Sequence, residues 1–209
     1  MAYIAAGTLK KSKLQVPVGD VRPTQRLLRL SIFDILADFI ENAAILDLYA
    51  GTGAFGIEAL SRGARKVVFV DIASKAVEII KVNLQNLGLR DKGVVYQSDS
   101  ITFLVKSVRK QRTFDIIFLD PPFTKLRAMR TDEYSDYMLE IIDRAKRLLR
   151  PQSLIIVKTP KKLPLPIPSG LTVVEERTYG LNRVAFLAQT EYIVQEETAH
   201  DTGITNSKT

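Results

Sequence analysis

Short apolar runs alternate along this chain with longer stretches in which apolar residues recur every three or four positions. Runs of the first kind are typical of buried strands, and stretches of the second kind are typical of amphipathic helices. Strands are predicted at residues 44–49, 66–71, 93–97, 114–119 and 153–158. Helices are predicted at residues 24–40, 55–61, 74–87, 101–110 and 134–149. Because consecutive parallel strands need crossover connections, this alternation predicts a parallel sheet with helices on both faces.

The two ends of the chain depart from this alternation. Residues 171–178 and 183–189 predict a closing hairpin, and residues 3–9 with 13–17 predict a smaller hairpin around a basic turn. The expected fold class is therefore α/β, a doubly wound Rossmann-like sheet with an antiparallel strand at or near one edge and a small N-terminal β-hairpin appendage. The predicted divisions are a basic hairpin appendage at 1–22, one α/β domain at 23–190 and a disordered polar tail at 191–209.

Two of the predicted helices carry sequence signals at their ends. Pro23 ends any preceding strand, and Thr24 is the predicted N-cap of the helix that runs to residue 40. Ser74 is the predicted N-cap of another helix, which stops at Gly88.

Composition narrows the possible chemistry. The 209 residues contain no cysteine, which excludes disulfides, cysteine-based zinc sites and thiolate catalysis, including the cysteine adduct used to methylate pyrimidine C5. The one histidine, His200, lies in the polar tail, and no metal site is expected. No apolar run approaches the roughly 20 residues that span a bilayer, and the first residues lack a secretory signal, so the cytoplasm is the expected location.

The charge of the chain favours a polyanionic partner. Net charge is +7 and the pI is about 9.6. Residues 1–30 contain six lysines and arginines against one acid, Asp20, whereas the tail from Glu191 onward is acidic. Positive charge is thus concentrated in the folded part, which favours nucleic acid as a partner. A merely soluble cationic protein is the alternative interpretation.

A glycine-rich turn follows the first predicted strand of the sheet. Gly51, Gly53 and Gly56 match G-x-G-x-x-G, and Asp71 lies 20 residues after Gly51, at the end of the next strand. An acid there can bind both hydroxyls of a ribose, so a dinucleotide and S-adenosylmethionine both fit. Asp47 distinguishes between these two cofactors. A carboxylate at this turn would repel the pyrophosphate of a dinucleotide, whereas it attracts the ammonium and sulfonium of S-adenosylmethionine. The pattern favours the methyl donor, with a loop-capping role for Asp47 as the alternative.

Ligands of doubly wound sheets bind beyond the carboxyl ends of the strands, so residues that follow each strand are candidates. Asp99 follows the third strand, where it can accept a hydrogen bond from an adenine amino group, cap the next helix, or do both. The predicted donor-binding residues are Asp47, Tyr49, Gly51, Thr52, Gly53, Asp71, Ile72, Ser98, Asp99 and Ser100. We expect the acids of this set to converge with Asp120 on one crevice.

The most specific motif follows the buried strand at 114–119, and its residues Asp120, Pro121, Pro122 and Phe123 are the catalytic candidates. An exocyclic amine on a base is a poor nucleophile because its lone pair is delocalised into the ring. Asp120 and the Pro121 carbonyl, which proline holds in place, can accept its two N–H groups and draw the lone pair out. Phe123 can stack on the base, worth about 1–3 kcal/mol. The motif predicts direct methyl displacement aided by positioning, with a Pro-Pro turn after a core strand as the alternative.

Several segments resemble the bacterial 16S ribosomal RNA guanine-N2 methyltransferases that act on the small subunit. The resemblance runs from about Tyr3 to Gln189. It is carried by Ala-Gly-Thr-Leu-Lys at 6–10 with Lys13-Leu14, Arg-Pro-Thr at 22–24, Leu-Asp-Leu-Tyr-Ala-Gly-Thr-Gly-Ala at 46–54, Gly-Ile-Glu-Ala-Leu-Ser-Arg-Gly-Ala at 56–64, Asp-Pro-Pro-Phe at 120–123, and Tyr179-Gly180 with Arg-Val-Ala-Phe at 183–186.

This resemblance implies methyl transfer from S-adenosylmethionine to guanine N2 in 16S rRNA, with an assembling small ribosomal subunit as the substrate. It also implies donor contacts at Asp47, Gly51, Gly53, Asp71 and Asp99. We expect a monomer that binds neither membrane nor metal. The candidate phosphate contacts are Lys10, Lys11, Lys13, Arg22, Lys125 and Arg127.

The chain departs in two places from the pattern that the family usually shows. After Thr24 the family continues Thr-Asp-Arg-Val-Arg-Glu, whereas residues 25–30 of this chain are Gln-Arg-Leu-Leu-Arg-Leu. The basic hairpin turn usually carries a glycine where this chain has Lys11. Both positions border the predicted substrate side.

Three other functions are weighed against this hypothesis. A nicotinamide-dependent oxidoreductase is permitted by the glycine turn and Asp71, but Asp47 and the motif at Asp120 argue against it. A non-catalytic RNA-binding or ribosome assembly factor with the same fold is supported only by the changes after Thr24. A DNA amino methyltransferase would share the chemistry, yet the short chain offers no obvious target-recognition domain.

Overall fold

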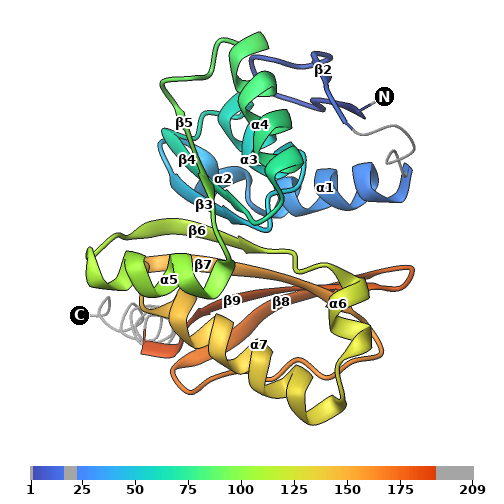
Figure 1. The fold of residues 1–209 in the computed structure, drawn as a ribbon, viewed down its shortest axis with the longest axis vertical. Helices are drawn as coiled ribbons and strands as arrows, with labels where there is room; N and C mark the ends of the chain where they lie inside the picture. The colour runs from blue at the N-terminus through green and yellow to red at the C-terminus, as the bar shows by residue number, and fades with distance from the viewer. Residues whose placement is uncertain (1, 17–22, 192–209) are drawn as a thin grey trace, which may run out of the picture.

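A seven-stranded mixed sheet lies at the centre of the molecule in the computed structural model, which describes residues 2–16 and 23–191 (Figure 1). The strand order is β5-β4-β3-β6-β7-β9-β8. The parallel strands are β3 (Ala44–Leu48), β4 (Lys66–Asp71), β5 (Gly93–Gln97), β6 (Phe114–Leu119) and β7 (Leu149–Pro160). Strand β9 (Asn182–Gln189) is antiparallel to β7 and to the edge strand β8 (Leu171–Tyr179). The predicted fold class is confirmed.

Helices cover both faces of the sheet. One layer consists of α1 (Pro23–Ile35), α2 (Ala37–Ile40), α3 (Ala54–Ser61) and α4 (Ser74–Asn86), and the other of α5 (Ser100–Arg109), α6 (Phe123–Ala128) and α7 (Thr131–Lys146). Neighbouring strand residues alternate between the layers, so Ile45 and Ile116 join the first core while Leu46 and Ile117 join the second. The apolar runs were therefore strands buried on both faces.

Four details of the helices differ from the prediction. The first helix begins at Pro23, one residue before the predicted cap Thr24, because a proline fits the first turn, where its missing N–H is not needed. It ends at Ile35, and α2 follows after Leu36. In α4, Ser74 is the first helical residue and Ala73 precedes it without a side-chain cap, so Ser74 is not the N-cap. The short helix α6 was not predicted, since six residues show too little periodicity.

The N-terminal hairpin is shorter than predicted. Its strands β1 (Ala2–Tyr3) and β2 (Lys13–Leu14) contain two residues each, and the chain between them packs on α3. Lys11 has a φ of 71°, a left-handed conformation that glycine adopts at much lower cost, which explains a glycine at this position in the resembling family. The predicted domain boundary after residue 22 stays a prediction, because residues 17–22 lie outside the described range. The same holds for Arg22 and for the tail beyond residue 191.

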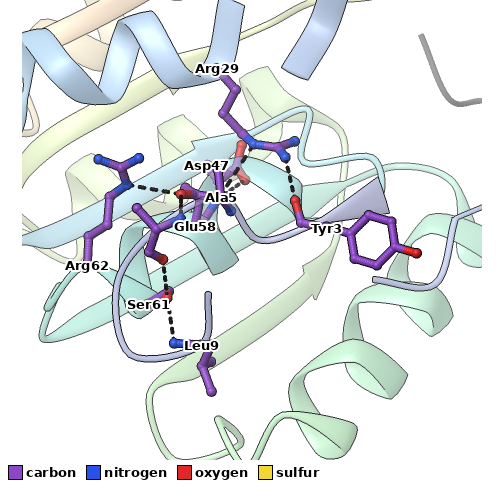
Figure 2. A network of polar contacts seen from close by, with 10 residues as sticks. Tyr3, Ala5, Leu9, Arg29, Asp47, Glu58, Ser61 and Arg62 are labelled. Carbon is purple, nitrogen blue, oxygen red and sulfur yellow. Dashed lines mark hydrogen bonds and ion pairs between the residues drawn. The ribbon is translucent and has the colours of Figure 1, made fainter. Parts of the chain in front are cut away.

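The buried side chain of Glu58 anchors this hairpin to α3 (Figure 2). Its carboxylate accepts the backbone N–H groups of Ala5 at 2.8 Å and Ala6 at 3.0 Å. It also pairs with the guanidinium groups of Arg62 at 3.0 Å and Arg29 at 3.7 Å. Because a buried carboxylate needs such partners, the hairpin and the helix stabilise each other.

Replacing Glu58 by glutamine should therefore loosen the hairpin without unfolding the sheet. Glutamine keeps the shape but loses the charge and one acceptor, so we expect the free energy of unfolding to fall by about 1.5–2 kcal/mol. Urea denaturation measures this loss, and amide hydrogen exchange at Ala5 and Ala6 should accelerate. Exchange rates and stability equal to those of the wild type would contradict the anchoring role.

Candidate active site

The glycine turn joins the carboxyl end of β3 to α3. Gly51 and Gly53 have φ values of 55° and 77°, which glycine adopts without strain. A Cβ on Gly56 would lie 2.2 Å from the ring of Phe69 and 2.7 Å from Val67, so the third glycine lets α3 pack closely on β4. The fingerprint thus lies between a strand and a helix, as its physical interpretation requires.

Asp47 lies on β3 just before this turn, and only 2% of its surface is exposed. Its Oδ2 accepts the backbone N–H of Gly56 at 3.0 Å, so the capping role is present. Burial raises the pKa of the Asp47 carboxyl to about 7; the Gly56 hydrogen bond opposes this shift, and the carboxylates of Asp120 and Asp71 add to it. A cationic ligand beside Asp47 would therefore relieve an unfavourable buried charge.

Asp71 and Asp99 lie beyond the ends of β4 and β5. The Asp71 carboxylate accepts the N–H of Gly51 at 2.8 Å and of Ala73 at 2.9 Å, which ties it to the glycine turn. Asp99 caps α5 by accepting the N–H of Thr102 at 3.0 Å, so the predicted capping role is confirmed. A carboxylate oxygen can accept more than one hydrogen bond, so these contacts leave room for ribose or adenine donors.

A cavity of about 160 Å³ lies between the glycine turn and the end of β6. Its lining residues are Leu28, Arg29, Asp47, Tyr49, Ala50, Gly51, Thr52, Ala54, Phe55, Asp120 and Lys158. Five predicted residues are thus brought together, and Asp120 faces the glycine turn across open space. The other candidates do not line the cavity, and they are Gly53, Asp71, Ile72, Ser98, Asp99, Ser100, Pro121, Pro122 and Phe123.

Asp120 is the first residue after β6, and its main contact is with Lys158 of the neighbouring strand β7. The Lys158 Nζ donates to both carboxylate oxygens of Asp120, at 2.8 and 2.7 Å. The same Nζ lies 5.2 Å from the centroid of the Phe123 ring. Burial raises the pKa of the Asp120 carboxyl, and the ammonium of Lys158 opposes that shift.

Sequence reasoning missed Lys158 and Arg29 as cavity residues. Lys158 lies near the carboxyl end of a predicted strand, so the rule that located the acids would also have found it. Arg29 lies between apolar positions of α1, where a 7% exposed charge is unusual. Its guanidinium contacts Glu58 and donates to the Tyr3 carbonyl at 3.0 Å, which places the hairpin against the cavity wall.

Tyr49 connects the cavity wall to the helices beyond β6. It has a φ of 68°, and its hydroxyl is hydrogen-bonded to that of Tyr137 on α7. The Lys125 Nζ on α6 donates to the same Tyr137 hydroxyl at 3.2 Å. Burial, then the contact with Tyr137, raises the pKa of Tyr49, so this phenol remains neutral. Helix α6, which carries Phe123, is thus connected through Tyr137 to Tyr49 in the cavity wall.

The basic candidates flank the cavity from two elements. Lys10, Lys11 and Lys13 are exposed on the hairpin, which Asn83 holds beside the glycine turn. The Asn83 side chain accepts the Gln15 N–H at 2.7 Å and donates to the Gln15 and Thr52 carbonyls at 3.0 and 3.2 Å.

The other basic candidates lie on α6, where Lys125 and Arg127 are exposed. In Figure 1 the hairpin and α6 both lie toward the right-hand side of the molecule. The Arg127 guanidinium lies 5.9 Å from the Phe123 ring centroid. Basic groups therefore stand on both the hairpin side and the α6 side of the motif at Asp120.

Among residues 2–16 and 23–191, no group of three or more His, Cys, Asp or Glu side chains is placed to hold a metal ion. Across the same residues, none of the helices combines the length and the apolar character that crossing a membrane requires.

The chain is similar to known proteins over most of its length. A family model described as conserved hypothetical protein 95 matches residues 2–188. The chain is 34% identical over 180 residues to ribosomal RNA small subunit methyltransferase D of Haemophilus influenzae, covering 85% of this chain and 89% of that protein. It is also 34% identical over 188 residues to a Bacillus subtilis protein named as a candidate rRNA methyltransferase, YlbH, covering 87% and 96%. Among solved structures, an Escherichia coli protein described as a candidate methyltransferase, yhhF, has a TM-score of 0.74 and 27% identity, covering 90% of this chain and 97% of that one.

Proposed function

This chain belongs to the family described as conserved hypothetical protein 95, and on that premise we propose that it methylates the exocyclic N2 amine of a guanine in 16S rRNA with S-adenosylmethionine as the donor. The observation that carries the proposal is the cavity in which Asp120 faces Asp47 and the glycine turn. We infer that the substrate is rRNA in an assembling small subunit, which implies action in the cytoplasm. One copy of the chain supplies every residue invoked.

The residues present fit the donor. Asp47 is a buried carboxylate, and its raised pKa shows that its ionised form is unfavourable without a neighbouring cation. The ammonium and sulfonium of S-adenosylmethionine would stabilise that ionised form. Gly51 and Thr52 would lie along the methionine part, Asp71 would hold the ribose, and Ile72, Ser98, Asp99 and Ser100 would border the adenine. A pyrophosphate would meet the same Asp47 charge unfavourably, which disfavours a nicotinamide cofactor.

The chemistry then depends on Asp120 and its neighbours. When bound, S-adenosylmethionine would supply an electrophilic methyl group that an amine attacks directly, so that a C–N bond forms as the C–S bond breaks and S-adenosylhomocysteine leaves. Asp120 accepts one N–H of the guanine amine and the Pro121 carbonyl accepts another, which turns the lone pair toward the cavity. Phe123 stacks on the base, which is flipped out of any helix to reach the site. Because positioning supplies much of the rate, no covalent intermediate is required.

The basic residues would hold the RNA around this site. Lys10, Lys11 and Lys13 on the hairpin, Lys125 and Arg127 on α6, and Arg22 are the proposed phosphate contacts. Each phosphate that they neutralise releases counterions, so binding should weaken steeply as salt rises. The contacts of the hairpin with Arg29 and Asn83 support this arrangement, because they fix its lysines beside the cavity.

The test is methyl transfer from labelled S-adenosylmethionine to 16S rRNA, offered naked and in small-subunit assembly particles, followed by nucleoside analysis. Label in N2-methylguanosine supports the proposal, and a preference for particles supports the assembly context. Label only in adenine or protein would overturn the substrate, and RNA binding without transfer would indicate a non-catalytic assembly factor. Thermal stabilisation by NAD but not by S-adenosylmethionine would favour the oxidoreductase.

A further inference from the structure

Lys158 is a charged side chain that lines the cavity, and it has no role in the chemistry proposed above. Its side chain is 13% exposed, and that of its partner Asp120 is 29% exposed. It reaches the cavity from β7, the strand that pairs with β6 immediately before Asp120. Its Nζ contacts both oxygens of Asp120 and lies over the face of Phe123, so one ammonium touches both groups proposed to meet the base.

Four charged side chains line this cavity, and they differ in what they contact. Asp47 and Asp120 are the acids, and Lys158 and Arg29 are the cations. Arg29 is directed to Glu58 and the Tyr3 carbonyl, and Asp47 to the N–H of Gly56. Lys158 donates to both oxygens of Asp120, while Asp47 is the neighbouring like charge.

The proposed role of Asp120 requires an ionised carboxylate. A protonated carboxyl group keeps one weak acceptor and presents a donor to the amine, which would repel its N–H. Burial and the nearby Asp47 both favour that protonated form. An ammonium bound to both oxygens favours the ionised form, and it also fixes the plane of the carboxylate. Each oxygen keeps a lone pair for the amine of the base.

We propose that Lys158 is a positioning residue for methyl transfer, whose ammonium holds the Asp120 carboxylate charged and aimed at the incoming amine while it orders the ring of Phe123. This inference rests on the proposed function and deepens it. It also assigns Asp120 as an acceptor rather than the final base, because the ammonium that contacts both of its oxygens opposes protonation of the carboxylate. The proton that the methylated nitrogen loses then passes to water.

The test compares Lys158→Met, which keeps the side-chain length and removes the charge, with Lys158→Arg, which keeps the charge. Lys146→Met is the matched control, since Lys146 is a 24% exposed, ion-paired lysine that lies outside the cavity, at the end of α7. For Lys158→Met we expect the acidic limb of the pH–rate profile to shift up by about one pH unit, so that kcat on that limb falls by about 10-fold. Lys158→Arg and Lys146→Met should keep the wild-type profile, and S-adenosylhomocysteine affinity should stay within about threefold in all variants.

A carbon-13 titration of the Asp120 carboxyl group, in wild type and in Lys158→Met, tests the same inference without any assay of turnover. The Asp120 pKa should be higher in the methionine variant. An unchanged titration, an unchanged pH–rate profile, or equal losses in the arginine and methionine variants would overturn the role of Lys158. If wild-type protein transfers no methyl group to rRNA, the proposed function fails by itself, and the titration still decides whether Lys158 controls the charge of Asp120.

Discussion

Replacing Asp120 by alanine should lower the rate of methyl transfer about 10³-fold and leave the affinity for the donor within about threefold. The loss follows from the role of the carboxylate, since a preorganised polar group that orients a reacting amine contributes about 10²–10⁴-fold to the rate. Donor affinity should persist because the donor-side acid, Asp47, lies on a different strand and keeps its hydrogen bond to Gly56. Single-turnover methyl transfer and calorimetric titration with S-adenosylhomocysteine measure the two quantities separately.

Two controls distinguish chemistry from structure in this experiment. Asp120→Asn keeps an acceptor oxygen of similar shape, so we expect an intermediate loss of about 10²-fold. Asp143→Asn removes a carboxylate from an ion pair with Arg147 on the surface of α7 and should leave the rate unchanged. Full activity in Asp120→Ala would remove the motif from the mechanism, and loss of donor binding in the same variant would indicate a collapsed cavity instead.

The strand-end rule predicted most of the acids of this site from sequence alone. Asp47, Asp71, Asp99 and Asp120 all lie at or just beyond the carboxyl ends of strands that are neighbours in the sheet. Two of them, Asp47 and Asp120, line one cavity, because the neighbouring parallel strands β3 and β6 place their ends at one edge of the sheet. Apolar runs bounded by glycine and proline predict where the strands end, and therefore which residues follow them, so this part of the site could be predicted from the sequence.

The packing of the N-terminal hairpin could not be predicted in the same way. Its contacts with α3 and α4 join residues more than 50 positions apart, as in the bonds from Ala5 to Glu58 and from Gln15 to Asn83. Periodicity reports which face of a helix is apolar, and it does not report which distant backbone will satisfy a buried Glu or Asn. The sequence therefore predicted a basic hairpin but not its position beside the glycine turn.

The cation Lys158 shows a different limit. The sequence predicted that Lys158 lies at the end of a strand. Its contact with Asp120, however, depends on the order of the strands, which puts β7 next to β6. A lysine at the far edge of the sheet would be ordinary surface charge, whereas here its Nζ is within 2.8 Å of both Asp120 oxygens. Side-chain pairing across neighbouring strands is a tertiary property, so the acid was predicted and its counter-ion was not.

Binding of the methyl donor should strengthen about 10-fold between pH 6 and pH 8, because Asp47 ionises in this range. Burial holds the pKa of that carboxyl at about 7. A bound cation favours the ionised form, so below pH 7 binding must first release a proton from Asp47 and affinity falls by up to about 10-fold per pH unit. Calorimetric titration in buffers of different ionisation enthalpy measures the proton released at pH 6 directly.

The variant Asp47→Asn should bind the donor about 100-fold more weakly at pH 8 and lose this pH dependence, because the amide keeps the shape but carries no charge.

Burial of Asp47 also sets the sign of the effect that the Asp47→Asn change has on folding stability. A pKa raised above its unfolded value gives stability that is present below about pH 4 and is lost as pH rises through 7, so without donor the asparagine variant should be more stable than wild type at pH 8 by up to a few kcal/mol. At pH 5 that gain should shrink, because wild-type Asp47 is then largely protonated in the folded protein. Two results would contradict this account of Asp47 as an unfavourable buried charge that a bound cation stabilises. One is a wild-type donor affinity that does not change from pH 6 to pH 8. The other is an asparagine variant that is less stable than wild type at pH 8.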